Sequence, residues 1–356
     1  MLSDPDRLIR WVMRAAIGER DPLPEPDAWL AGIESLRGNR LTPLAALLLG
    51  PGLERLPESV QRELRQTVAR ARYANLRILE QYQRLVPALN RSSIPWIILK
   101  GMPLACRLYP DPVCRPARDI DLLAPPYARA EVERLLLDLG YSRAPSGLTD
   151  YHVTYRRTVG RTDDLVELHW AIESPSARAP ATEALLAARQ PCETPAGAVW
   201  VAATAPERDL LVRHYVRHSG WQAILLLDLL LHVGEDVLYH PLGAVPADDA
   251  RRLGLPHRVS GPADWRLRPL RRWLARHPFA GRRLRRRAGT FRTLLALRAT
   301  RGSWLTALRE HLWPTRPSER WERLAGSTLG RWYWRPWRLL TFGRWGQPGR
   351  HPGGGR

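Results

Sequence analysis

The sequence contains little cysteine and no long apolar run. Its 356 residues include only three cysteines, Cys106, Cys114 and Cys192, and no C-x-x-C pair. So sparse a set argues against a disulfide framework or a cysteine-rich zinc site, and the reducing cytoplasm is the expected compartment. The most apolar stretch, 224–233, is interrupted by Asp228 and is shorter than the ~18 residues that a membrane-spanning helix needs.

Lysine is nearly absent as well. Of the 55 basic residues, 54 are arginine, and Lys100 is the single lysine. Where arginine supplies almost every cation, a lone lysine indicates a position at which a compact ammonium group is preferred over the planar guanidinium. Chance survival of this lysine is the alternative.

Positive charge is concentrated in one part of the chain. Residues 251–356 hold 26 arginines and 4 acidic residues, a net charge of +22, whereas residues 1–250 have a net charge of −2. The two parts are therefore expected to contact different partners.

The apolar pattern predicts a compact α/β unit between helical segments. Helical spacing covers residues 1–92, in which 58–90 reads as one long helix or two in series, and returns at 206–233. The predicted strands are 95–99, 118–123, 151–157 and 165–169, with helices at 102–109 and 128–139. The expected fold class is α/β (α+β), a small mixed-sheet core with large N- and C-terminal helical additions.

Four segments are expected along the chain. An N-terminal helical segment (1–92) precedes the α/β core (93–200) and a helical domain that packs on it (201–250). The basic region (251–356) is rich in arginine and tryptophan, and we expect it to be partly helical with a disordered tail.

Two carboxylates stand two residues apart in the predicted strand R-D-I-D-L-L. Side chains at this spacing, Asp119 and Asp121, point to the same face with Cα atoms roughly 6.5–7 Å apart. Ionised carboxylates held side by side in an apolar strand are costly unless a cation lies between them. Mg²⁺ prefers such oxygen ligands together with substrate phosphates, and a two-metal site would align an attacking oxygen with a leaving pyrophosphate.

A third carboxylate lies in the later strand L-V-E-L-H-W. Glu167 is expected to share a metal with Asp119 and Asp121 or to take the proton of the attacking hydroxyl. His169 is two residues further on, so it faces the same way and is expected to border the site.

A phosphate-binding turn is expected where the first strand ends. Gly101 would permit close approach of a phosphate, and Lys100 would add a point charge against a polyphosphate. Arg115 and Arg118 flank the acidic strand and either bind phosphate or form ordinary salt bridges.

These motifs resemble the uncharacterised nucleotidyltransferase family of the polymerase-beta-like nucleotidyltransferase superfamily. The resemblance rests on L-K-G-M-P-L-A-C-R-L-Y-P-D-P-V-C-R-P-A-R-D-I-D-L-L, then L-G-Y, V-E-L-H-W and the helical D-L-L-V-R-H-Y-V-R-H-S-G-W, and covers roughly residues 94–233. It implies a glycine turn at Gly101, a metal pair at Asp119 and Asp121, and Glu167 as the third acid. The turn is Lys-Gly where the superfamily usually has Gly-Gly or Gly-Ser, and Glu167 replaces the commoner aspartate.

Two histidines occupy one face of the helix that follows the core. His214 and His218 are four residues apart, a spacing that suits metal ligands, but no H-E-x-x-H pattern surrounds them. A helical lid over the nucleotide or acceptor is the favoured functional interpretation, and packing in the core is the alternative.

The basic region alternates arginine with tryptophan, and 9 of the 15 tryptophans lie in residues 251–356. This pattern suits a nucleic acid, through phosphate contacts and base stacking, or an anionic membrane surface. Packing of the tryptophans under an arginine-covered surface is the third interpretation.

Two functional hypotheses follow. The first is a Mg²⁺-dependent nucleotidyltransferase, with a nucleoside triphosphate (NTP) as substrate and an unknown acceptor (a small molecule, a peptide or a protein). The second is a non-enzymatic scaffold whose basic region binds nucleic acid or an anionic membrane. The expected location is cytoplasmic, with peripheral membrane attachment as the alternative.

Overall fold

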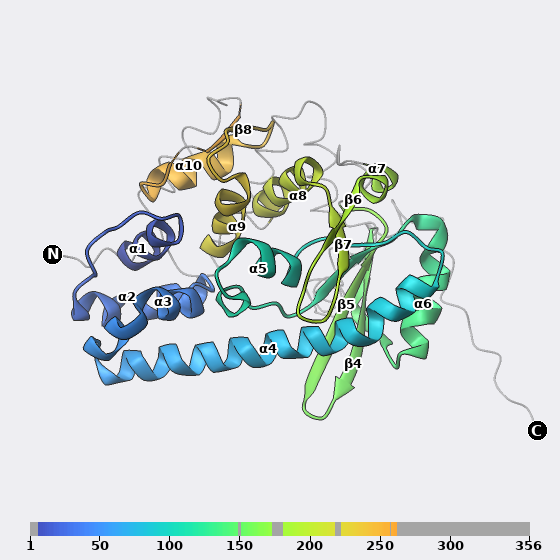
Figure 1. Ribbon diagram of the computed structural model, residues 1–356, viewed down its shortest axis with the longest axis horizontal. Helices are drawn as coiled ribbons and strands as arrows, with labels where there is room; N and C mark the ends of the chain where they lie inside the picture. The colour runs from blue at the N-terminus through green and yellow to red at the C-terminus, as the bar shows by residue number, and fades with distance from the viewer. Residues whose placement is uncertain (1–5, 149–150, 173–180, 218–221, 257, 262–356) are drawn as a thin grey trace, which may run out of the picture. The chain divides into compact units, whose positions relative to one another are not determined.

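The computed structural model describes residues 6–148, 151–172, 181–217, 222–256 and 258–261 (Figure 1). The chain divides into two units, Met1–Leu308 and Arg309–Arg356, and every described residue belongs to the first. The predictions for His218 and for the basic region from residue 262 onward lie outside the described residues.

Helices form the N-terminal part, as the apolar spacing predicts. They are α1 (Arg7–Ala16), α2 (Pro26–Gly38), α3 (Thr42–Leu49), the 3₁₀ helix η1 (Gly50–Arg55) and α4 (Glu58–Arg91). The long segment is one helix of 34 residues. It runs beneath the N-terminal helices, and its second half passes across the sheet (Figure 1). Its first half packs Val60 and Leu64 with the N-terminal helices, and its second half packs Ile78 and Tyr82 with the sheet.

The core of the protein is a mixed five-stranded sheet in the order β1-β2-β5-β4-β3. Its strands are β1 (Ile97–Ile98), β2 (Ile120–Leu123), β3 (Ser142–Leu148), β4 (His152–Val159) and β5 (Thr162–His169). Strands β2 and β5 are parallel and the other neighbours are antiparallel. The helices α5 (Met102–Leu108) and α6 (Arg129–Asp138) and the 3₁₀ turns η2 (Pro112–Cys114) and η3 (Pro126–Ala128) lie between them in the chain. The predicted fold class is confirmed.

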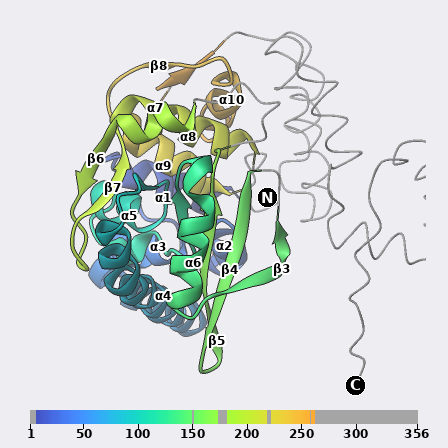
Figure 2. The same cartoon turned by 90° about the vertical axis from the view of Figure 1, so that its right-hand side faces the viewer.

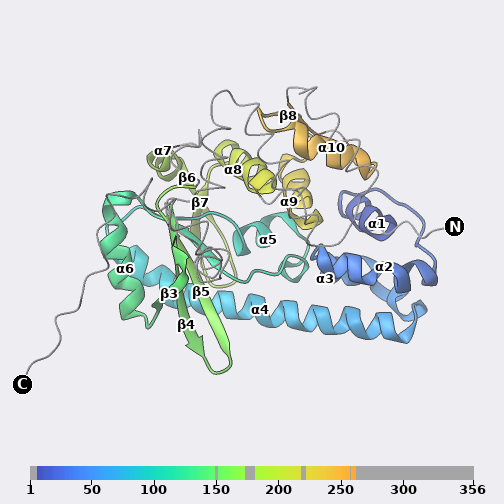
Figure 3. The same cartoon turned by 180° about the vertical axis from the view of Figure 1, so that it is seen from behind.

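Strand β3 has no counterpart among the predicted strands. Its sequence, S-R-A-P-S-G-L, contains proline and glycine and lacks the apolar alternation of a half-buried strand. Proline is tolerated at a sheet edge because its missing N–H faces no partner, and β3 is an edge strand (Figure 3). Pairing with β4, rather than local preference, therefore accounts for this strand.

The two faces of the sheet differ in polarity, because side chains alternate along each strand. The apolar face carries Ile120, Leu122, Val166 and Leu168, all buried against α4 and α6. Figure 2 shows α6 alongside the long strands. The opposite face carries Asp121 of β2 together with Glu167 and His169 of β5, so these candidate site residues lie on one side of the sheet.

The helices after the core share a hydrophobic cluster with the N-terminal helices. The later elements are α7 (Thr182–Ala187), β6 (Arg189–Cys192), β7 (Val199–Ala202), α8 (Thr204–Arg217), α9 (Ala223–Val233), β8 (Leu238–Tyr239), α10 (Ala244–Arg252) and β9 (Val259–Ser260). Helix α9 is apolar on all sides and buried, and its Leu226 and Leu230 join the cluster that contains Leu8 and Trp29. The limits of the four predicted segments stay a prediction.

Among the described residues, the structure contains no helix that is both long enough and apolar enough to cross a membrane.

A buried carboxylate links α8 to α5 and α9, and we expect it to make stability depend on pH. Glu207 contacts Arg107 at 2.6 Å and His232 at 2.5 Å. Burial alone would raise the pKa of Glu207, but the bonds from His232 and Arg107 hold it below the ordinary 4.5. A depressed pKa means that the ionised form stabilises the fold above about pH 4.5 and that this contribution is lost as pH falls through the folded-state pKa.

We expect Glu207→Gln to be less stable at neutral pH and to lose less of its stability on acidification than the wild type. Urea unfolding at a series of pH values from about 6 to about 3 measures both effects. If the free energy of unfolding fell equally with pH in the wild type and in Glu207→Gln, Glu207 would not be the source of the pH dependence.

Candidate active site

The two aspartates lie at the start of β2 on the polar face of the sheet. Asp121 is within the strand, and its exposure is 1 %. Asp119 comes immediately before the strand and is partly exposed. Burial and repulsion from Asp121 raise the pKa of Asp119. Burial would also raise the pKa of Asp121, but Lys100 and His169 hold it well below its usual value. One carboxylate is thus stabilised as an anion, and its neighbour is not.

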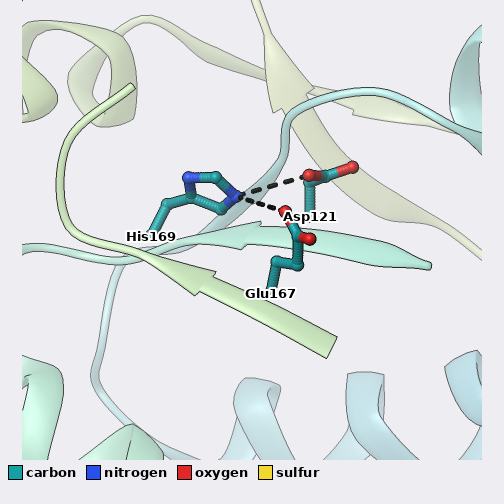
Figure 4. A group of neighbouring side chains, drawn as sticks. All are labelled: Asp121, Glu167 and His169. Carbon is teal, nitrogen blue, oxygen red and sulfur yellow. Dashed lines mark ion pairs between the residues drawn. The ribbon is translucent and has the colours of Figure 1, made fainter. Parts of the chain in front are cut away.

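Glu167 points toward Asp121, as the prediction of a third carboxylate requires. Strands β2 and β5 are parallel with Asp121 and Glu167 in register. Both carboxylates meet the His169 ring, whose Nε2 lies 3.3 Å from Asp121 Oδ1 and 3.5 Å from Glu167 Oε2 (Figure 4). Ligand atoms of the three residues all lie within 4.8 Å of one another, close enough to share a metal ion.

The donor set fits a divalent cation. Asp121 Oδ1 and both ring nitrogens of His169 are buried, and apart from the contacts of Nε2 with the two carboxylates they have no hydrogen-bond partner among the described residues. Buried polar atoms without a well-formed hydrogen bond are costly and indicate a missing partner. Two carboxylates suit Mg²⁺, and the imidazole nitrogen adds a donor that Mn²⁺ and Zn²⁺ also accept. His169, expected only to border the site, is therefore placed at its centre.

The single lysine contacts one of the two aspartates. Leu99 N–H donates to Asp121 C=O at 2.9 Å, so β1 holds the next residue, Lys100, beside β2. The Lys100 ammonium contacts Asp121 Oδ2, and its side chain is 17 % exposed. Burial alone would lower the pKa of Lys100, but Asp121 and Asp119 raise it, so the group stays charged. This position explains a compact ammonium group better than chance survival does.

Gly101 supplies the turn after Lys100. Its φ of +83° lies in the region that only glycine adopts readily, so a side chain here would strain the backbone. An added Cβ would stand 3.7 Å from the carbonyl oxygen of Asp119, which is ordinary contact. Backbone conformation, rather than crowding, therefore requires the glycine.

The two flanking arginines have different surroundings. Arg115 is buried and donates from Nε and Nη2 to the two carboxylate oxygens of Asp228, each at 2.7 Å. Tyr109 O–H donates to the same carboxylate at 2.8 Å, which makes Asp228 the centre of a buried cluster. The geometry favours the salt-bridge alternative for Arg115. Arg118 is exposed and has no ion-pair partner within the described ranges.

Helix α8 closes one side of the site. A small cavity is lined by Lys100, Asp121 and His169 of the core and by Leu210, Arg213 and His214 of α8. The last three fall at helical spacing, so the structure brings the predicted His214 to the cavity together with Arg213, which sequence reasoning missed. Arg213 Nε also donates to Asp209 at 2.7 Å.

An aromatic row extends from the site along β4. His152 is in register with His169, and their rings stack with centroids 4.8 Å apart. Tyr151 lies 4.9 Å from His152, also between ring centroids. The local sequence offers no sign of this stacking, because it depends on the pairing of β4 with β5.

Among the comparisons with known proteins, a family model matches more than half of the chain. Residues 26–231 match the family described as "Uncharacterised nucleotidyltransferase", a range that begins at α2 and includes every candidate site residue. A crystal structure of an antigenic nucleotidyltransferase-like protein from Paracoccidioides brasiliensis aligns at 20% identity with a TM-score of 0.32, covering 44% of this chain and 75% of that chain. A search of curated proteins found no significant match.

Proposed function

Because this chain belongs to the uncharacterised nucleotidyltransferase family, we propose that it transfers a nucleoside monophosphate from an NTP to an acceptor and releases pyrophosphate. The acceptor offers a hydroxyl or another nucleophilic group and is a small molecule, a peptide or a protein. The observation that carries the proposal is the register of Asp121 with Glu167, together with the Lys100 contact to Asp121.

The carboxylates are the proposed metal ligands. Asp119, Asp121 and Glu167 would hold Mg²⁺, with His169 beside them. When bound, Mg²⁺ supplies neutralisation of the charge that develops on the phosphate oxygens. The bonds and charges of His169 and Lys100 lower the pKa of Glu167 despite burial and the nearby Asp121. A carboxylate with a lowered pKa is a weaker proton acceptor, so this shift suits a ligand role better than that of a general base.

The cations of the site are the proposed triphosphate ligands. The reaction forms a bond from the acceptor oxygen to the α-phosphorus and breaks the bond from that phosphorus to the pyrophosphate oxygen. Lys100 and the turn at Gly101 would hold the phosphates next to the carboxylates, and Arg118 would contact them from the exposed side. Arg115 would instead support this loop through Asp228. His214 and Arg213, on the opposite wall, would contact the nucleotide or the acceptor.

Incubation of the full chain with α-labelled NTPs, Mg²⁺ and a cell extract tests the proposal. We expect one class of molecule to become labelled, and we expect no labelling with EDTA or with the Asp119→Ala/Asp121→Ala double variant. Calorimetry on the same proteins measures nucleotide affinity directly. Equal affinity of the wild type and the double variant for every NTP would remove the basis of the proposal.

A further inference from the structure

The second residue after helix α2 has a backbone conformation that favours glycine. Arg40 has φ +61°, the only positive φ of a non-glycine residue in the part of the chain that the structure describes. Leu41 N–H donates to Leu36 C=O at 3.0 Å and Arg40 N–H to Arg37 C=O at 3.1 Å. This is the Schellman pattern of helix ends, and Arg40 occupies the left-handed position where glycine is strongly preferred. An arginine there costs about 1 kcal/mol relative to glycine.

The Arg40 side chain reaches the loop that leads into the active-site strand. Its Nη2 donates to the carbonyl oxygen of Pro116 at 2.5 Å. Asn75 already anchors this loop, because its amide accepts from Ala117 N–H at 2.9 Å and donates to Pro112 C=O at 2.7 Å. Because Asn75 already holds the loop, anchoring the loop is a weak explanation for an arginine at position 40.

Arg40 also lacks the partner that comparable arginines have. Four partly or fully buried arginines each bond a buried carboxylate: Arg77, Arg107, Arg115 and Arg157. Arg40 forms no ion pair among the described residues, and its one hydrogen bond is to a backbone carbonyl. A partly buried guanidinium with unused donors is suited to a bound anion.

The hydrogen bond to Pro116 places this guanidinium beside the loop that leads to Asp119, and the neighbouring charges act on it there. Burial and repulsion from Arg115 and Arg118 lower the pKa of Arg40 to about 10, whereas Asp119 and Asp228 act to raise it. Asp228 already neutralises Arg115. Arg40 and the exposed Arg118 are therefore the two guanidiniums at the loop before β2 that have no carboxylate bonded to them in the described ranges.

We propose that Arg40 and Arg118 form an anion subsite beside Asp119 that binds the pyrophosphate end of the NTP. The inference rests on the proposed function and adds a residue from the N-terminal helical segment to the site. Lys100 is held on Asp121, whereas Arg40 is held on the loop that precedes Asp119, so the two arginines would take the phosphates that leave. The planar guanidinium matches phosphate oxygens in two-pronged hydrogen bonds, which an ammonium cannot form.

Arg40→Gly separates binding from folding, because glycine is the residue that this backbone position prefers. We expect the unfolding midpoint in urea to be unchanged or higher than that of the wild type. We expect affinity for inorganic tripolyphosphate to fall by about tenfold to a hundredfold, as the loss of a charge-assisted bond predicts. Calorimetry at about 0.3 M salt suppresses diffuse binding to the arginine-rich region, which is the same in every variant.

The matched control is Arg37→Ala, an exposed arginine on the same helix that pairs with Glu34. It should bind tripolyphosphate like the wild type, and Arg118→Ala should weaken binding as Arg40→Gly does. Tripolyphosphate affinity unchanged in Arg40→Gly would overturn the subsite, as would a lowered unfolding midpoint that accounts for the loss. Arginine-dependent tripolyphosphate binding without any nucleotide binding would support the subsite and remove the nucleotidyl-transfer assignment instead.

Discussion

Asp119→Asn is expected to abolish nucleotidyl transfer and, in the metal-free protein, to raise the free energy of unfolding. The loss of activity should be about a thousandfold or more, equivalent to about 4 kcal/mol of transition-state stabilisation. The gain in stability should be about 1 kcal/mol, the scale of other relieved surface repulsions. Asp119 repels Asp121 and gains too little from its cations, as its raised pKa indicates. A neutral amide removes that repulsion together with the metal ligand.

Asp121→Asn is the informative comparison, because we expect it to lower the free energy of unfolding, whereas Asp119→Asn should raise it. Asp121 is the partner of the Lys100 ammonium and of the His169 ring. Removing its charge leaves a partly buried cation without its carboxylate, so both activity and stability should fall. Two adjacent aspartates would then share a catalytic role but contribute to folding with opposite signs.

Pyrophosphate release with Mg²⁺ measures the activity, and urea unfolding in EDTA measures the stability. Asp163→Asn is the control, since this carboxylate is on β5 of the same sheet but its side chain is exposed, at 42 %. It should retain full activity. The interpretation fails if Asp119→Asn retains activity within tenfold of the wild type, or if it unfolds at a lower urea concentration.

The second large effect concerns the buried cluster at Asp228. We expect Asp228→Ala to lower the free energy of unfolding by about 3–5 kcal/mol, the usual result of leaving one partner of a buried ion pair. The guanidinium of Arg115 would lose both of its bonds to the carboxylate, and the Tyr109 hydroxyl would lose its acceptor. Helix α9 would lose the contact that joins it to α5 and to the loop before β2.

Chemical denaturation of Asp228→Ala, Arg115→Met and the double variant Arg115→Met/Asp228→Leu measures the effect. The double variant should be more stable than either single variant, because it buries no charge and keeps an apolar volume. If Arg115 were instead a phosphate ligand, Arg115→Met would fold with wild-type stability and show only a raised KM for the NTP. Wild-type stability of Asp228→Ala would contradict the structural assignment.

The local sequence was sufficient to predict features that depend only on backbone geometry over a few residues. The two-residue repeat of a strand places Asp119 and Asp121 on one face, and the same repeat places Glu167 with His169. The change from helical spacing to short apolar runs near residue 94 indicates the sheet and its helical flanks. The bias of the basic residues toward arginine, with Lys100 as the exception, drew attention to a residue that contacts Asp121.

Long-range contacts needed the tertiary structure. Arg115 and Asp228 are 113 residues apart, and nothing near either residue in the sequence indicates that they pair. The edge strand β3 forms because β4 offers it a partner, despite its proline and glycine. The conformation of Arg40 follows from the way in which α2 ends, and its contact with the loop before β2 follows from the packing of that helix end beside the loop.

One physical reason explains why strand faces could be predicted from the sequence and long-range contacts could not. Strand and helix periodicities are set by backbone geometry over a few residues, so a chain displays them in its pattern of apolar and polar side chains. Which segments lie side by side depends on the burial of apolar surface over the whole domain, and a single sequence does not display that sum. The sequence alone therefore indicated the family and the strand face that carries the candidate carboxylates, and the tertiary structure decided which arginines of the described residues remain without a carboxylate bonded to them.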